Sequence, residues 1–236
     1  MPNAVLFDWG HTLMDFRWDP ALLGRGHEAG LRALGLEPSP PLTERFEERY
    51  LPLLLAPDTL EEVEYPGLVR ELLAGAGIDV DDAGLCRFLE AEHAEWDEAR
   101  VLGATTHALL DALRARGIRL GLVSNVFDPG WLVRRDLDGM GLTERLDAIV
   151  LSSEIGWRKP DPRIYRAALD TLDVAPEEAI FVGDRLLEDV AGPAALGLGT
   201  VLALWYRIEE SDEIEPDARA HAPLDVLEIV DRVFPS

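Results

Sequence analysis

The sequence predicts an α/β fold, in which helices flank a doubly wound parallel sheet and an all-helical domain is inserted near the start. Two observations predict this fold. Short apolar runs of the β type alternate with helical stretches of about ten residues, which is typical of parallel βαβ units. An interval of roughly a hundred residues separates the first apolar run from the second, and because a βαβ crossover needs far fewer, it must contain structure of its own.

Five apolar runs predict the strands of the sheet. They are Ala4–Phe7, Ile118–Val123, Ala148–Leu151, Ala179–Val182 and Thr200–Leu204. Apolar residues recur at helical spacing in the stretches between and after most of these runs. The helices predicted from this spacing are His107–Arg116, Arg163–Leu172, Leu187–Leu196 and Leu224–Val233. Gly117 follows the first of them and stands where a helix C-cap glycine is expected.

The long interval after the first strand contains further helical patterns with Glu- and Arg-rich polar faces and apolar opposite faces. They cover Pro20–Leu34, Leu42–Leu55, Leu60–Ala76 and Asp82–Trp96. Proline-rich stretches at Pro38–Pro41 and Ala56–Asp58 predict loops between these helices. We therefore predict a helical domain over 16–98 and a core domain over 1–15 and 99–236.

Composition narrows the classes of partner and compartment. The 236 residues carry a net charge of -23, which argues against nucleic acid and anionic membranes because both are bound through Lys and Arg. A phosphate group would need strong local positive charge in such a protein. Cys86 is the single cysteine, so no intramolecular disulfide is expected. With no export signal and no apolar stretch long enough to span a membrane, a cytoplasmic location is predicted.

Polar motifs follow the predicted strands where ligands bind in open parallel sheets, at the carboxyl ends. In chain order they are Asp8-Trp9-Gly10-His11-Thr12-Leu13, Ser124-Asn125, Lys159-Pro160-Asp161-Pro162, and Gly183-Asp184 with Asp189. Each alone has an ordinary explanation as a turn, an N-cap or a helix start. Together they supply carboxylates for Mg²⁺, a hydroxyl and backbone amides for phosphoryl oxygens, and a lysine for charge neutralisation.

This combination resembles the motifs of the haloacid dehalogenase superfamily of hydrolases, in the subfamily with a helical cap inserted after the first motif. The matching pattern is Asp8-x-x-x-Thr12-Leu13, Ser124-Asn125, Lys159-Pro160-Asp161-Pro162 and Gly183-Asp184-x-x-x-x-Asp189. The resemblance covers essentially the whole chain. It implies a modified Rossmann core, a helical cap, and Mg²⁺-dependent hydrolysis of small phosphorylated metabolites through an aspartyl-phosphate.

The resemblance also implies a role for each matching residue. Asp8 is the nucleophile, and Mg²⁺ is held by Asp8, the carbonyl of Gly10 and Asp184. Phosphoryl oxygens are bound by Ser124, Asn125 and Lys159, with Trp9 and Gly10 included in the phosphate site. Thr12 shapes the first loop. Asp189 orients Lys159 or a metal-bound water.

One position departs from the family pattern. Phosphatases with these motifs carry a second aspartate two residues after the nucleophile, where this chain has Gly10. That residue acts as general acid and base, a function commonly worth about 10² to 10⁴ in rate. His11 could supply the proton, since its ordinary pKa lies near neutrality. Alternatively the leaving group needs little protonation, as in acyl and enol phosphates or a carbonyl-bearing phosphonate, or the protein is a catalytically weak binder of phosphorylated ligands.

Two related chemistries fit the sequence less well. A haloacid dehalogenase also lacks the second aspartate, but it needs no metal, and Asp184 beside Asp8 would only add repulsion to a metal-free site. Phosphonate cleavage with a cap lysine as Schiff base does not fit, because Lys159 is the only lysine in the chain.

Substrate selection is expected in the cap. The candidates are Arg17, Trp18, Arg25 and His27 after the first hinge, and Trp157-Arg158 before the lysine. The expected assembly is a monomer or a homodimer.

Overall fold

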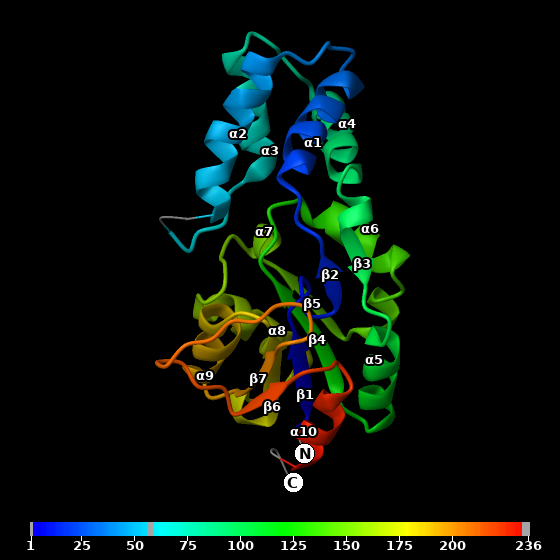
Figure 1. The fold of residues 1–236 in the computed structure, drawn as a ribbon, viewed down its shortest axis with the longest axis vertical. Helices are drawn as coiled ribbons and strands as arrows, with labels where there is room; N and C mark the ends of the chain where they lie inside the picture. Colours follow the sequence, from blue (N-terminus) through cyan, green and yellow to red (C-terminus); the bar gives the residue numbers. More distant parts are fainter. Residues whose placement is uncertain (1, 56–58, 233–236) are drawn as a thin grey trace.

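A parallel sheet forms the centre of the computed structural model, which describes residues 2–55 and 59–232 (Figure 1). Within these residues the sheet has six strands in the order β5-β4-β1-β6-β7-β8, and every neighbouring pair is parallel. Their bounds are β1 Ala4–Phe7, β4 Arg119–Ser124, β5 Ala148–Leu151, β6 Ala179–Gly183, β7 Gly199–Ala203 and β8 Ala218–Ala220. The predicted α/β fold with a Rossmann-like parallel sheet is thus confirmed.

Helices cover both faces of this sheet, which explains why its strands read as continuous apolar runs. Alternate residues of a strand face opposite sides, so β1 contributes Val5 and Phe7 to one apolar cluster and Ala4 and Leu6 to the other. The first cluster is covered by α5 (Thr106–Ala115), α6 (Gly130–Gly139) and α10 (Asp225–Arg232), and the second by α8 (Pro162–Leu172). Shorter elements are η1 (Asp97–Ala99), η2 (Thr143–Arg145), α7 (Ser152–Ile155), η3 (Pro176–Glu178), η4 (Leu186–Ala191) and α9 (Gly192–Ala194).

Four described helices make up the helical insert, defined here as α1 (Pro20–Ala33), α2 (Pro40–Leu55), α3 (Tyr65–Gly75) and α4 (Asp82–Ala94). It lies beyond one end of the sheet (Figure 1). Gly30 lets α1 approach α4 closely, because a Cβ there would lie 2.6 Å from the ring of Phe88. The insert has its own apolar cluster, which includes Leu31, Phe46 and Phe88 and also takes in Phe127 from the loop after β4.

A short antiparallel pair connects the insert to the core. β2 (Met14–Phe16) leads out of the core, and β3 (Arg100–Leu102) leads back, with Asp15 opposite Val101. Domain boundaries at residues 16 and 98 stay a prediction, and this pair lies beside both of them. No described helix combines the length and apolar character that crossing a membrane requires.

Some elements differ from the sequence-based prediction. The predicted helix over Leu187–Leu196 is a π-helical turn, η4, followed by the short α9, and α6 and β8 were not predicted. Residues 60–64 precede α3, because Glu64 caps the helix by accepting a hydrogen bond from the Gly67 N–H. Pro40 opens α2 instead of lying in a loop, as the first helical turn tolerates proline. The loop predicted over 56–58 lies outside the described residues.

A buried ionic network joins the insert to the core. His93 on α4 places Nδ1 2.9 Å from Asp128 and Nε2 2.8 Å from Asp136 on α6. The Nε of Arg100 lies 3.0 Å from the same Asp136 carboxylate. Burial alone would lower the pKa of His93, but its hydrogen bonds to the carboxylates of Asp128 and Asp136 outweigh burial and raise that pKa to about 9. His93 is therefore a cation at neutral pH.

The raised pKa predicts how stability depends on pH. Because the folded-state pKa of His93 exceeds its ordinary value of 6.5, its contribution to the free energy of unfolding is complete below pH 6.5 and is lost as pH rises through about 9. The loss is on the order of 3 kcal/mol. Denaturant titrations between pH 6 and 10 should show this decline in the wild type and in His221→Gln, an exposed control. A decline of the same size in His93→Gln would contradict the prediction.

Candidate active site

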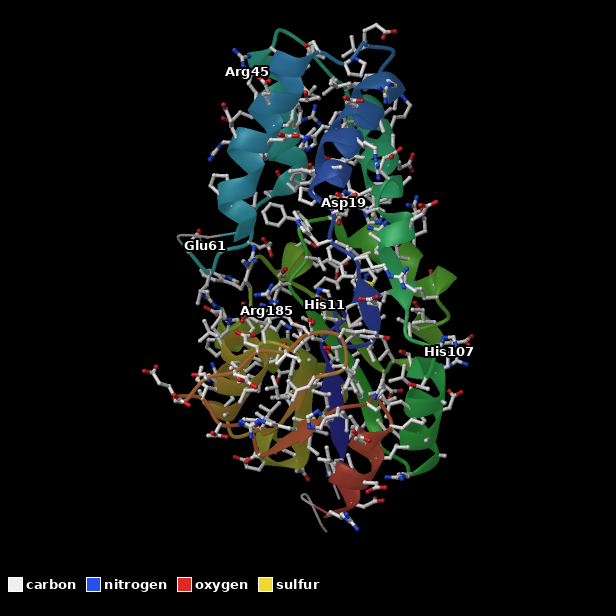
Figure 2. All side chains as sticks on the ribbon, viewed as in Figure 1. His11, Asp19, Arg45, Glu61, His107 and Arg185 are labelled. Carbon is white, nitrogen blue, oxygen red and sulfur yellow. The ribbon has the colours of Figure 1, made fainter. Side chains whose placement is uncertain are left out.

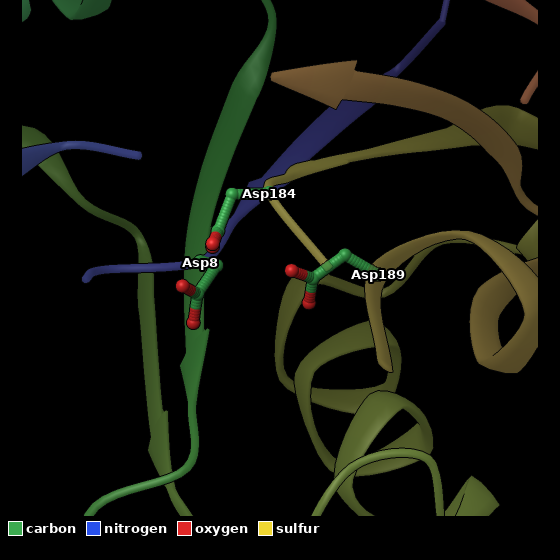
Figure 3. A group of neighbouring side chains, drawn as sticks. All are labelled: Asp8, Asp184 and Asp189. Carbon is green, nitrogen blue, oxygen red and sulfur yellow. The ribbon is translucent and has the colours of Figure 1, made fainter. Parts of the chain in front are cut away.

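The motifs predicted from the sequence converge at one edge of the sheet. β1 lies between β4 and β6, so the residues at the carboxyl ends of these strands become neighbours. Asp8 follows β1, Ser124 ends β4, and Asp184 follows β6. Oxygens of Asp8, Asp184 and Asp189 lie within 4.8 Å of one another, and all three residues are buried (Figure 3).

Lys159 links two of these acids. Its Nζ donates hydrogen bonds to Oδ1 of Asp8 and Oδ1 of Asp189, each 2.7 Å long. Burial opposes the charge of the ammonium, but the attraction of Asp189 and Asp8 is stronger and raises the pKa of Lys159 above its ordinary value. The amide side chain of Asn125 holds the lysine's backbone, accepting from the Lys159 N–H at 2.7 Å and donating to its carbonyl at 3.2 Å. The sequence did not predict this positioning role of the Asn125 side chain.

The acids differ in how well they are satisfied. Asp189 accepts from Lys159 with one oxygen and from the Arg185 N–H, at 2.9 Å, with the other. Oδ2 of Asp184 is buried and has no hydrogen-bond donor among the described residues, and its nearest cation is Nη1 of Arg207, 3.7 Å away. Burial and then repulsion from Asp8 and Asp189 raise the pKa of Asp184 to about 8. A buried carboxylate in this condition fits a bound divalent cation.

The hydrogen-bond partners of Asp189 suit it to a different role from that of Asp184. Burial raises its pKa to about 6, and the attraction of Lys159 opposes that rise. Since both of its oxygens already have donors, Asp189 is suited to orient Lys159, and Asp8 and Asp184 are the acids suited to hold a metal.

The loop from Asp8 to Leu13 is stabilised by one hydrogen bond of its own turn and by side chains from other parts of the fold. Its turn forms as the Trp9 carbonyl accepts from the Leu13 N–H at 3.0 Å. Thr106 Oγ1 donates to the Leu13 carbonyl at 2.7 Å, and Trp205 Nε1 donates to the Thr12 carbonyl at 3.0 Å. Thr12 itself contributes no side-chain hydrogen bond within the described part of the chain. Thr106 and Trp205 were missed from the sequence, although Trp205 follows β7 closely enough to signal a place at this edge.

His11, in the middle of this loop, lies between the sheet and the insert (Figure 2), and Gly10 precedes it in the chain. A Cβ added to Gly10 would meet no atom within 4 Å, so the position has room for a side chain. His11 has a φ of 56°, in the left-handed region. Burial, followed by the charge of Arg207, lowers its pKa below the ordinary 6.5. His11 is thus mainly neutral at pH 7, and its role as proton donor stays a prediction.

Comparison with known proteins decides the family. The sequence model of the haloacid dehalogenase-like hydrolases matches residues 2–197. The chain belongs to this family. A phosphoglycolate phosphatase of Aquifex aeolicus is 34% identical over 233 residues, which are 97% of each chain. A phosphoglycolate phosphatase of Rhodospirillum rubrum is 32% identical over 225 residues, which cover 86% of this chain and 79% of that one.

Other similarities are shorter or concern the fold. A phosphoserine phosphatase of Thermus thermophilus is 39% identical over 112 residues, 48% of this chain and 44% of that one. The crystal structure of a HAD phosphatase from Thermococcus onnurineus superposes with a TM-score of 0.67 at 23% identity, covering 97% of this chain and 98% of that one. The 2-haloacid dehalogenase of Pseudomonas syringae superposes with a TM-score of 0.69 at 24% identity, covering 98% and 99%. Both structures show that this hydrolase has the family's fold.

A cavity of about 190 Å³ opens above the motif residues of the hydrolase. Its floor includes Gly10, Ser124 and Asn125, and its walls come from the insert and the residues flanking it, from β2 and β3, and from the loop after β4. Of the residues predicted to select substrate, Trp18 lines the cavity. Arg17 instead pairs with Asp15 at 3.0 Å, Arg25 with Glu95 at 3.8 Å, and the fully buried His27 with Glu92 at 3.1 Å.

The insert also contacts the loop that carries Lys159. The backbones of Glu61 and Trp157 form an isolated antiparallel β-bridge, and the Arg158 N–H donates to the Leu60 carbonyl at 2.8 Å. The Glu62 carboxylate accepts a hydrogen bond from Ser152 and lies 3.2 Å from Nη1 of Arg158. Trp157 stacks with Arg163, whose guanidinium carbon lies 3.0 Å from the ring centre. Trp157 and Arg158 therefore have structural partners in this hydrolase.

Proposed function

We propose that this hydrolase is a Mg²⁺-dependent phosphatase of small phosphorylated metabolites, with Asp8 as its covalent nucleophile. The observation that carries the proposal is the buried cluster in which Lys159 binds Asp8 while Asp184 keeps an oxygen without a donor among the described residues. Several relatives are named as phosphatases of small metabolites, which supports the same class of substrate. A cytoplasmic location and a monomeric or homodimeric state are part of the same proposal.

The proposed metal ligands and the lysine that orients Asp8 have separate roles in the mechanism. Asp8, Asp184 and the carbonyl of Gly10 would hold Mg²⁺, which supplies positive charge against the phosphate. By binding Oδ1 of Asp8, Lys159 orients the carboxylate for attack on phosphorus. Splitting hydrolysis into formation and breakdown of an aspartyl-phosphate makes each step easier.

Phosphate is received on the neighbouring strand. The Ser124 hydroxyl and the backbone amide of Asn125 follow β4 and would donate to phosphoryl oxygens. Lys159 adds the charge that an anionic substrate needs in a protein of net charge -23. Halide displacement is less well supported, since it needs no metal and would leave the buried Asp184, whose Oδ2 has no hydrogen-bond donor among the described residues, without a role beside Asp8.

Phosphate release tests the proposal directly. Purified protein with Mg²⁺ should hydrolyse acetyl phosphate and p-nitrophenyl phosphate, EDTA should abolish the release, and excess Mg²⁺ should restore it. Acetyl phosphate is included because its leaving group needs little protonation. No turnover across a broad panel of phosphometabolites with Mg²⁺, Mn²⁺ and Co²⁺ would contradict an enzyme and favour a binder of phosphorylated ligands.

Gly10→Asp should increase turnover of phosphate monoesters. The position has room for the side chain. Its carboxyl group could protonate the oxygen of the leaving group, whereas Gly10 has no side chain that can donate a proton. We expect about a tenfold to hundredfold rise in kcat on benzyl phosphate, whose alkoxide leaving group needs a proton, and a smaller rise on acetyl phosphate. Gly75→Asp, at an exposed and equally open position, is the matched control. An unchanged kcat in a folded Gly10→Asp protein would show that the missing acid does not limit the rate.

A further inference from the structure

The cavity above the phosphate site limits what the phosphate can be attached to, and this inference rests on the proposed function. Gly10, Ser124 and Asn125 border the cavity, so a phosphate bound there would direct its leaving group into it. The volume of about 190 Å³ exceeds the roughly 150 Å³ of an apolar cavity that admits benzene. The space therefore suits a leaving group about the size of one six-membered ring.

The walls of the cavity are largely aromatic. Phe16 and Trp96 stack with their ring centres 5.7 Å apart, and Trp18 lies 5.2 Å from Trp96. Tyr65 meets Phe127 edge-on, with the ring centres 5.9 Å apart. All five residues line the cavity. Such walls favour an apolar or aromatic group over a hydrated one.

Glu92 places a carboxylate in this apolar wall. Its side chain is buried, and its partners within the described residues, the hydroxyl of Tyr65 and Nε2 of His27, both contact Oε1. Among the described residues no donor reaches Oε2. A ligand in the cavity that carries a hydrogen-bond donor, either a hydroxyl or an ammonium, would satisfy this oxygen.

The other charged residues of the cavity are already paired. Arg100 donates to Asp97 at 2.8 Å and lies 3.0 Å from Asp136, and Asp128 is paired with His93 at 2.9 Å. A leaving group with its own carboxylate would thus meet the buried Glu92 and no unpaired cation among the described residues. Burying two carboxylates together is costly.

We propose that the substrate is a phosphate ester of a compact, mostly apolar alcohol about one ring in size, which carries a hydrogen-bond donor for Glu92. Carboxylate-bearing esters such as phosphoglycolate are poor substrates, although relatives of the chain are named for that compound. Glu92 and Trp96 determine specificity in this scheme, Glu92 by accepting the donor and Trp96 by packing on the ring.

Primary alkyl phosphates of matched reactivity test the proposal on the wild-type protein with Mg²⁺. The panel is benzyl phosphate, its 3-hydroxymethyl and 3-aminomethyl derivatives, and 2-phosphoglycolate. Acetyl phosphate is the control that shows whether the protein hydrolyses phosphate compounds at all. We expect kcat/KM for benzyl phosphate to exceed that for phosphoglycolate at least about tenfold, and at least one donor-bearing derivative to exceed benzyl phosphate by a similar factor. The derivative that gains shows whether the donor is a hydroxyl or an ammonium.

The outcomes separate this inference from the proposed function. Turnover of acetyl phosphate together with a preference for phosphoglycolate, or with no gain from either donor, overturns the inference alone. Absence of turnover on every compound overturns both.

A substitution then tests the role of Glu92. In Glu92→Gln the ratio of kcat/KM for the favoured donor-bearing ester to that for benzyl phosphate should fall at least about tenfold. Glu90→Gln, an exposed position on the same helix, should keep the wild-type ratio. An unchanged ratio in folded Glu92→Gln overturns the assignment, and if that variant does not fold, the wild-type ranking decides.

Discussion

Asp8→Asn should reduce phosphate release at least about 10⁴-fold, the largest effect expected of any substitution in the chain. The amide keeps the size of the side chain but cannot form the acyl-phosphate bond with phosphorus. The fold should survive, because Lys159 retains the Asp189 carboxylate as a partner at 2.7 Å. The measurement is initial rate on acetyl phosphate at saturating Mg²⁺, with circular dichroism to confirm folding.

A matched control makes this result specific. Asp170→Asn removes an exposed carboxylate from α8 and should keep the wild-type rate. In addition, acid-quenched wild-type protein should carry a phosphate on the peptide that contains Asp8, detected by mass spectrometry. Retention of a tenth or more of the activity by Asp8→Asn would remove the nucleophile from the mechanism.

Asp184→Asn should produce opposite effects on activity and on the stability of the metal-free protein. Activity should fall at least about 10²-fold, since one of the acids proposed to hold Mg²⁺ becomes neutral. Without metal the variant should melt at a higher temperature than the wild type, because it no longer buries a carboxylate against Asp8 and Asp189. Thermal unfolding with EDTA and with Mg²⁺ measures both effects.

The change in melting temperature when Mg²⁺ is added distinguishes Asp184→Asn from the wild type and from a control variant. Wild type and Asp212→Asn, an exposed control, should gain stability when Mg²⁺ is added, whereas Asp184→Asn should gain little. If Mg²⁺ stabilised Asp184→Asn as much as the wild type, the cation would have to bind elsewhere.

The parts of the fold that local sequence determines were predictable. Strands buried on both faces must be apolar throughout, so runs such as Ala4–Phe7 and Ala179–Val182 were visible without any alignment. The convergence of Asp8, Asp184 and Lys159 followed from the topology, since parallel strands end at the same edge.

Elements that depend on distant contacts were not predictable. β2 and β3 have three residues each and exist only because they pair with each other across the insert. α6 combines an unusual start at Pro129-Gly130 with a polar middle, so its apolar residues gave a weak helical signal. Arg207, near Asp184, lies far from the motifs in sequence, and only the fold brings it to the site.

The contacts of residues 60–62 with the loop before Lys159 connect the insert mechanically to the residue that pairs with Asp8. Hydrogen bonds attach this segment to the backbone of Gly156 and Arg158 and to the side chain of Ser152. An outward swing of α3 must either break those bonds or pull the lysine's loop along with it. A movement of α3 that widened the cavity would consequently also disturb Lys159, whose Nζ lies 2.7 Å from Oδ1 of Asp8.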